Sequence, residues 1–241
     1  MPDATVKRTP AHDALLKEGY DLLIKYEGDI GRVKMQDVAK RAGLTSGAFY
    51  NVWPGGLPAF QQSLLEFALA AEHISYLNDI LSGLESVGPA VMPLTEVVRQ
   101  FCARDVEHLK RDPGFRVQVA LWARHGSDTS VANALRASYE ELSGRYVEVY
   151  DAVLAAYGRA WRHPFTGISF ATLLTALAEG LAMRNAVDPD NTPPELAPAD
   201  SDAGGWELFG LATATLLASA TRPVAGDDTS AWVDLGQLDD A

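Results

Sequence analysis

The sequence predicts an all-α protein in which a small N-terminal helical domain precedes a larger helical body. Apolar residues recur at intervals of three and four along most of the 241 residues, as they do on the buried face of a helix. Residues 32–54 read as two short helices joined by a glycine-containing turn. Two later segments, 167–187 and 206–221, each carry a stripe of large apolar residues and a stripe of small ones.

The first predicted helix covers about residues 11–27 and ends at Gly28 and Gly31. Its apolar stripe consists of Leu15, Gly19, Leu22 and Tyr26, with Leu16, Tyr20 and Leu23 beside it. We expect this helix to support the two-helix stretch that follows it.

Residues 32–54, RVKMQDVAKRAGLTSGAFYNVWP, have the pattern of a helix, a tight turn and a second helix. Gly43 stands where the turn needs a positive φ, and Thr45 or Ser46 can cap the second helix. Apolar residues at helical spacing give the two helices an inward face: Met35, Val38, Ala39, Ala48, Phe49 and Val52. The outward residues of the second helix are small or hydrogen-bonding: Ser46, Gly47, Tyr50 and Asn51. A DNA major groove admits a short helix of this kind.

This stretch closely resembles the DNA-binding motif of the tetracycline-repressor (TetR) family, over roughly residues 11–65. The resemblance rests on Asp37, Val38, Ala39, Ala42, Gly43, Leu44, Ser46, Gly47, Phe49, Tyr50, Trp53 and Pro54. The family usually has phenylalanine where Trp53 stands and often a capping Ser or Thr where Lys34 stands. It commonly has a phosphate-binding lysine just after the aromatic–proline pair, where this chain has Gly55-Gly56. The missing lysine predicts weaker non-specific affinity for DNA.

The resemblance implies an all-α homodimer with an N-terminal three-helix helix-turn-helix domain and a C-terminal helical regulatory and dimerisation domain. We assign residues 1–54 to DNA binding and residues 55–221, whose first helix is a connector, to ligand binding and dimerisation. Residues 222–241 form an acidic tail.

Two sets of residues are expected to contact DNA. Lys34 and Tyr50 should meet phosphates, and Ala48 can touch a thymine methyl group. The residues expected nearest the base edges are Gln36, Thr45, Ser46, Gly47 and Asn51.

The net charge of −12 is distributed unevenly. Residues 1–65 sum to +1 and the remaining residues to −13, while residues 32–54 carry four basic residues against one acidic residue. An acidic body should orient the N-terminal end toward the phosphates of DNA. The alternative explanation for the excess of basic residues over 32–54 is a solvated helix face that happens to be basic and binds no partner.

The body is predicted to be a series of helices. After the connecting helix, the helical pattern resumes over residues 93–110, with Val97, Phe101, Val106 and Leu109 inward. Asp112-Pro113-Gly114 reads as a turn before a short helix over 115–124, and residues 125–128 as a second turn. A long helix then covers about 129–157 with a heptad-like apolar stripe and ends at Gly158. Residues 188–205 read as an acidic, proline-rich loop.

The last two helices resemble the pair that builds a four-helix dimer interface in the TetR family. In 167–187 the small-residue stripe is Ala171, Thr175, Ala178 and Ala182; in 206–221 it is Gly210, Ala214 and Ala218. Two apolar faces per helix exceed what the edge of a monomer usually needs. The alternative is a helix pair internal to one chain.

The sequence offers no catalytic constellation, metal-ligand spacing or phosphate-binding loop, so we predict neither an enzyme nor a resident cofactor or metal. Cys102, the single cysteine, reads as a buried small hydrophobe. No apolar run is long enough to cross a membrane. Together with the single cysteine and an N-terminus that lacks an apolar core, this favours a cytoplasmic protein.

A ligand pocket in the helical body is implied by the resemblance, not by any spacing of residues. The candidates are aromatic and polar residues on otherwise apolar faces: Phe101, Asp105, Trp122, His125, Tyr139, Tyr146, Trp161 and Glu179. Ordinary core packing is the alternative role for each. Aromatic linings would suit an apolar or aromatic effector.

The resulting expectation is a ligand-responsive transcriptional regulator, a repressor released from a palindromic operator by a small molecule. The alternative is a helical small-molecule or protein binding module that has lost specific DNA binding. Two features favour this alternative: Gly55-Gly56 and the acidic body.

Overall fold

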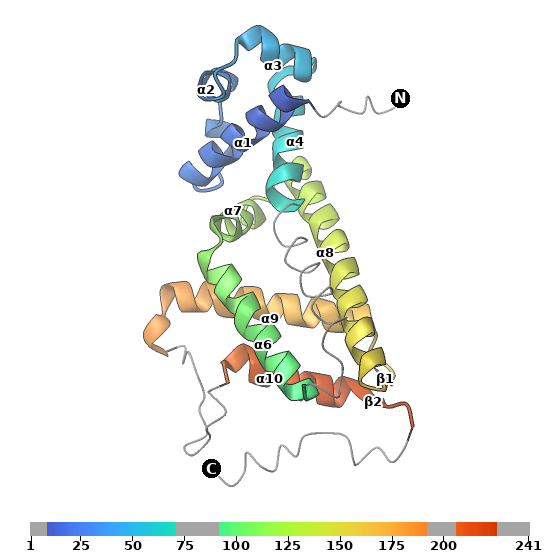
Figure 1. Cartoon of the computed structure of the whole chain (residues 1–241). Coiled ribbons are helices and arrows are strands. Elements are labelled where there is room, and N and C mark those ends of the chain that lie inside the picture. Colours follow the sequence, from blue (N-terminus) through green and yellow to red (C-terminus); the bar gives the residue numbers. More distant parts are fainter. Residues whose placement is uncertain (1–8, 71–91, 192–205, 226–241) are drawn as a thin grey trace. The chain divides into compact units, whose positions relative to one another are not determined.

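The computed structural model describes residues 9–70, 92–191 and 206–225 (Figure 1). These residues are almost entirely helical and divide into two compact units. The first unit is made from residues up to 73 and from 112–141, and the second from 74–111 and from 142 onward. The predicted all-α fold with an N-terminal helix-turn-helix is therefore confirmed.

The first unit begins with α1 (Pro10–Lys25), the 3₁₀ turn η1 (Ile30–Arg32), α2 (Met35–Arg41) and α3 (Ser46–Val52) (Figure 1). Thr9 caps α1 by accepting a hydrogen bond from the amide of His12, and Pro10 suits the first helical turn because it lacks an N–H. The buried residues of α1 follow the predicted stripe: Leu15, Leu16, Gly19, Leu22 and Leu23.

The remaining helices of this unit are α4 (Gly56–Ala70), α7 (Pro113–Trp122) and the first half of α8 (Thr129–Ala156). Leu121 and Val131 are fully buried in the same apolar core as Leu15, Phe49 and Phe60. α7 therefore packs against α1 and α4, although a long stretch of chain separates it from both. The predicted connector beyond Ala70 lies outside the described residues.

Gly28 fixes the approach of α7 to α1. Its φ of +80° is one that side-chain-bearing residues rarely adopt, and a Cβ on it would lie 2.6 Å from the Cβ of Ala120. Glycine thus serves here both the turn and the close packing against α7.

The second unit contains α6 (Leu94–Arg111), the rest of α8, the strand β1 (Arg159–Trp161), α9 (Gly167–Val187), η2 (Pro189–Asn191), α10 (Leu208–Ala220) and the strand β2 (Thr221–Pro223). α6 packs against both α9 and α10 (Figure 1). β1 and β2 form an antiparallel ladder that pairs Ala160 with Arg222. Thr166 and Ser169 form a capping box at the start of α9.

The structure corrects the sequence reading at several points. α7 begins at Pro113, not Phe115, because the Asp112 side chain accepts a hydrogen bond from the Gly114 amide and caps the helix. The buried stripe of α6 shares only Leu109 with the predicted one and consists of Val98, Cys102, Asp105 and Leu109. The two strands were not predicted, since three residues are too few to show an alternating pattern.

The small-residue stripes of α9 and α10 lie mostly on the buried sides of these helices. Ala171, Ala178 and Ala182 are buried inside the chain, as are Gly210 and Ala214. The exposed face of α9 carries other residues: Ile168, Thr172, Leu173, Ala176, Gly180 and Met183. All of these are uncharged, so α9 has one apolar face buried in the chain and a second, uncharged face that is exposed.

Among the described helices, none is long and apolar enough to cross a membrane.

Candidate nucleic-acid interface and ligand region

The turn between α2 and α3 has the geometry that the sequence predicted. Gly43 has a φ of +67°, and the Thr45 hydroxyl accepts a hydrogen bond from the Ala48 amide at 3.2 Å, which caps α3. Lys34 occupies the cap position of α2 without a side-chain cap, as expected for a lysine. Its Nζ donates instead to the carbonyl oxygen of Gly31 at 2.6 Å.

An aromatic cluster holds the inward face of α3. Phe49 and Trp53 are buried, and their rings lie 5.1 Å and 4.9 Å from that of Phe60 on α4. The His12 ring stacks on Trp53 at 5.2 Å, and the Trp53 indole N–H donates to the Ser63 hydroxyl at 3.0 Å. Sequence reasoning did not predict these roles of His12 and Ser63. Trp53 is thus held by a stacking partner and a hydrogen-bond acceptor.

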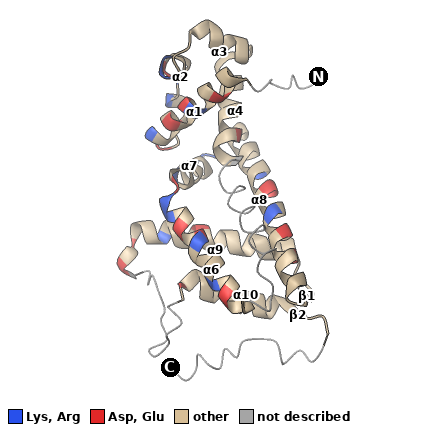
Figure 2. Ribbon diagram, in the orientation of Figure 1, with Lys and Arg blue, Asp and Glu red and all other residues tan. Residues whose placement is uncertain are grey.

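The outward face of α3 is free of charge. Every residue expected at a base edge or phosphate is exposed except Ala48, which is half-buried, and the Tyr50 side chain is 50% exposed. In Figure 2 the ribbon of α3 has neither blue nor red segments, whereas α1 and α2 carry both colours. Gln36 lies in the first turn of α2 and is exposed.

The basic residues counted in the motif are not equally available. The Arg41 guanidinium donates to Glu18 at 2.7 Å and lies 3.8 Å from an Asp21 oxygen, so its charge is paired on α1. The Arg32 guanidinium lies over the Tyr26 ring at 4.3 Å. Lys34 and Lys40 are exposed and remain as candidate phosphate contacts.

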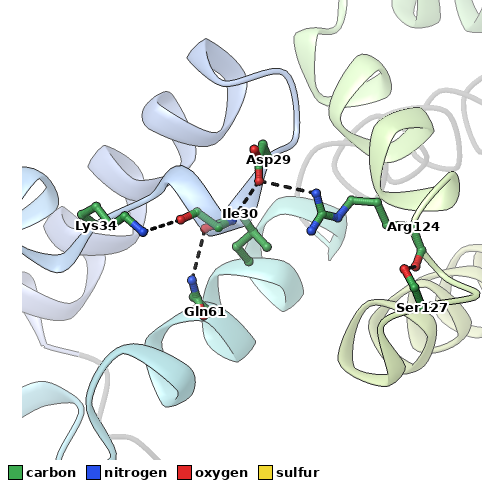
Figure 3. Close-up of polar contacts among 7 residues, drawn as sticks. Asp29, Ile30, Lys34, Gln61, Arg124 and Ser127 are labelled. Atoms are coloured by element: carbon green, nitrogen blue, oxygen red, sulfur yellow. Dashed lines mark hydrogen bonds and ion pairs between the residues drawn. The ribbon is translucent and has the colours of Figure 1, made fainter.

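The turn η1 that leads into α2 is held from three sides (Figure 3). Gln61 of α4 donates to the Ile30 carbonyl at 3.1 Å, and Lys34 donates to that of Gly31. The Arg124 guanidinium, between α7 and α8, reaches the Asp29 carboxylate at 3.4 Å. These contacts fix the start of α2 against the rest of its unit.

The predicted ligand-lining residues fall into both units. Trp122, His125 and Tyr139 belong to the first. Trp122 is 56% exposed with the His125 ring 5.1 Å from its own, and the Tyr139 hydroxyl accepts a hydrogen bond from Gln118 at 3.3 Å. The other five candidates belong to the second unit: Phe101, Asp105, Tyr146, Trp161 and Glu179.

Three of those five lie together in the interior of the second unit. The buried Tyr146 hydroxyl donates to the buried Asp105 carboxylate at 3.1 Å, and the Phe101 ring lies 6.3 Å from that of Tyr146. Burial raises the pKa of Asp105 to about 6, and the hydrogen bond from Tyr146 opposes that rise. Cys102 is buried, as the sequence predicted, and burial raises the pKa of its thiol to about 12, so it stays protonated.

Two residues that sequence reasoning missed join Trp161 to this cluster. The Tyr146 ring stacks on Tyr150 at 5.7 Å, Tyr150 packs against Phe170 at 5.1 Å, and Phe170 lies 5.3 Å from Trp161. The spacing of Tyr146 and Tyr150, one helical turn apart, was a signal for this row. The half-buried Glu179 lies on α9 of the same unit.

Comparison with known proteins places the fold. No model of a known protein family and no curated protein sequence matches this chain. Among solved structures, Escherichia coli NemR in its reduced form is 15% identical, with a TM-score of 0.58 over 75% of this chain and 90% of NemR. GusR of Salmonella enterica is 13% identical, with a TM-score of 0.57 over 90% of this chain and 98% of GusR. A TetR transcription regulator from Haloarcula marismortui is 10% identical, with a TM-score of 0.54 over 75% and 88%. The chain has the fold of TetR-type transcription regulators.

Proposed function

We propose that this protein is a cytoplasmic, DNA-binding transcription regulator that acts as a homodimer. The observation that carries the proposal is the exposed, uncharged face of α3, held on a capped helix-turn-helix by a buried aromatic cluster. Such a helix can enter a major groove while α2 crosses the backbone. The shared fold with TetR-type regulators supports the same role.

A dimer supplies the second reading helix that a palindromic operator requires. α9 exposes only uncharged residues over 168–183, and α10 contains no charged residue at all. A monomer seldom leaves such a surface in contact with water. We infer that α9 and α10 pair with the same helices of a second copy.

We propose further that the regulator is a repressor released by a small molecule bound in the second unit. The cluster of Asp105, Tyr146 and Phe101, continued by the aromatic row to Trp161, gives an apolar ligand aromatic surface and a few polar groups to orient it. Release requires only that the ligand bind more tightly to a conformer in which the two reading helices no longer fit the operator.

The test is a titration of the purified full-length protein against duplexes from the DNA flanking its own gene, at several salt concentrations. A regulator should bind one duplex far more tightly than a scrambled one. Tyr50→Ala should weaken binding to all duplexes about equally, since Tyr50 is placed at a phosphate. Dissociation constants of about 10⁻⁴–10⁻⁶ M for every duplex would leave the alternative, a binding module without specific DNA recognition.

That alternative has specific observations in its favour. Gly55 and Gly56 replace the lysine expected before α4, and Arg41 is paired with acidic residues of α1. Both reduce the positive charge available to phosphates.

A further inference from the structure

The side chains that α3 exposes limit which base pairs it can read, and this extends the proposed function from DNA binding to operator composition. The face of α3 that remains after Phe49 and Trp53 are buried consists of Ser46, Gly47, Ala48, Tyr50 and Asn51, with Thr45 at the cap. The inference rests on α3 being the reading helix.

Guanine and cytosine are read in the major groove chiefly by charged side chains. Arginine and lysine donate to the O6 and N7 acceptors of guanine, and aspartate and glutamate accept from the N4 amino group of cytosine. α3 contains none of these residues. Neither base of a G·C pair therefore meets its usual partner on this helix.

The cations nearest α3 do not supply the missing guanine contact. Arg41 is paired with Glu18 and Asp21 on α1, and Arg32 stacks over Tyr26. Lys34 lies at the start of α2, where it is assigned to a phosphate rather than to a base edge. Lys40 lies in the last turn of α2, the helix that crosses the backbone in this motif, where phosphates are the available partners.

Among the groups that α3 presents, the Asn51 amide and the methyl groups match the A·T pair, whereas the Ser46 and Thr45 hydroxyls can bond to either pair. The exposed Asn51 amide can both donate to N7 and accept from the N6 amino group of adenine. The methyl groups of Ala48 and Thr45 can contact the C5 methyl of thymine. Gly47 has no side chain, so the helix can approach the base edges closely. On α2, exposed Gln36 carries the same kind of adenine-reading amide.

We infer that the base pairs facing α3 in each operator half-site are A·T pairs, with Asn51 reading an adenine. In the operator, G·C pairs should occur only at positions that α3 does not contact.

The test is selection of bound duplexes from a randomised library by the full-length protein, followed by affinity measurements on the selected site. We expect inverted half-sites with an A·T core. Replacing the A·T pair that Asn51 reads by G·C in both half-sites should weaken wild-type binding about tenfold per half-site, and Asn51→Ala, which removes the contact from both subunits, should weaken binding to the parent site by a similar factor. The combination should be no weaker than either change alone, because both remove the same contact.

Asn133→Ala is the matched control, since Asn133 is an exposed asparagine on α8, far from α3 in sequence. It should leave affinity and base preference unchanged. Enriched half-sites whose Asn51-dependent positions are G·C would overturn this inference and leave the proposed regulator intact. A library from which no sequence is enriched would overturn the proposed function, and the inference with it.

Discussion

At the scale of single residues, the Asp105 carboxyl is a buried group whose pKa falls within the range of ordinary experiments. Its carboxyl is almost fully buried, with the Tyr146 hydroxyl as a donor, and its pKa is raised to about 6 from 3.8. Between those two pH values the folded protein holds a proton that the unfolded chain has released. Stability therefore falls as the pH rises through this window, and the loss is complete above about pH 6.

Asp105→Asn removes the buried charge and keeps an oxygen that accepts from Tyr146. We expect the variant to gain stability over the wild type by about 3 kcal/mol between pH 4 and pH 7, which is the size of the pKa shift. Urea unfolding of both proteins at the two pH values, followed by tryptophan fluorescence, measures this difference. A difference that is the same at both pH values would show that the carboxyl titrates normally.

At the scale of elements, the contact between α1 and α7 depends on Gly28. Gly28→Ala would place a methyl group 2.6 Å from the Cβ of Ala120 in a backbone conformation with φ of +80°. We expect it to destabilise the first unit by roughly 2 kcal/mol. Gly126→Ala, in the turn before α8 with open space around it, should change stability by less than about 0.5 kcal/mol. Urea unfolding compares the two; equal effects would mean that α7 does not pack against this turn.

The difference between local contacts and contacts between distant segments, such as that of α1 with α7, explains which parts of the fold could be predicted from the sequence. The helix-turn-helix was readable because Gly43, Thr45 and Phe49 act locally, through a turn, a cap and one inward face. The burial of Leu121 and Val131 beside Phe49 depends on packing between segments far apart in the chain, which periodicity does not encode. The candidate site divides in the same way: α3 was predicted residue by residue, whereas the row through Tyr150 and Phe170 was not.

At the scale of the whole molecule, the proposed regulator is strongly negative and would approach DNA through a few cations. Lys34 is exposed, and only one of its three ammonium donors is needed by the Gly31 carbonyl. Lys34→Ala should therefore reduce the slope of log affinity against log salt by about 0.9 for each bound subunit. Arg41→Ala is the matched control: its charge is already paired, so it should leave the slope unchanged and cost at most about 1 kcal/mol of stability. Equal reductions of the slope would show that the Arg41 pair opens on DNA.

The exposed face of α9 predicts how the molecule assembles. Ala176 lies in the middle of that face, between Thr172 and Gly180, with Met183 and Leu173 exposed nearby. Ala176→Arg would place a charge inside an apolar interface without a partner, and desolvating that charge costs several kcal/mol. We therefore expect the variant to sediment as a monomer under conditions where the wild type is a dimer. It should keep its helical circular dichroism, because the substituted position is exposed within one chain. Ala137→Arg, at an exposed position of α8 in the first unit, should remain dimeric.

Because two reading helices at a fixed spacing bind a palindrome far more tightly than one, the monomeric variant should also lose specific operator binding while retaining weak, salt-sensitive binding. A wild-type protein that sediments as a monomer at micromolar concentration would instead assign the apolar face of α9 to a different partner.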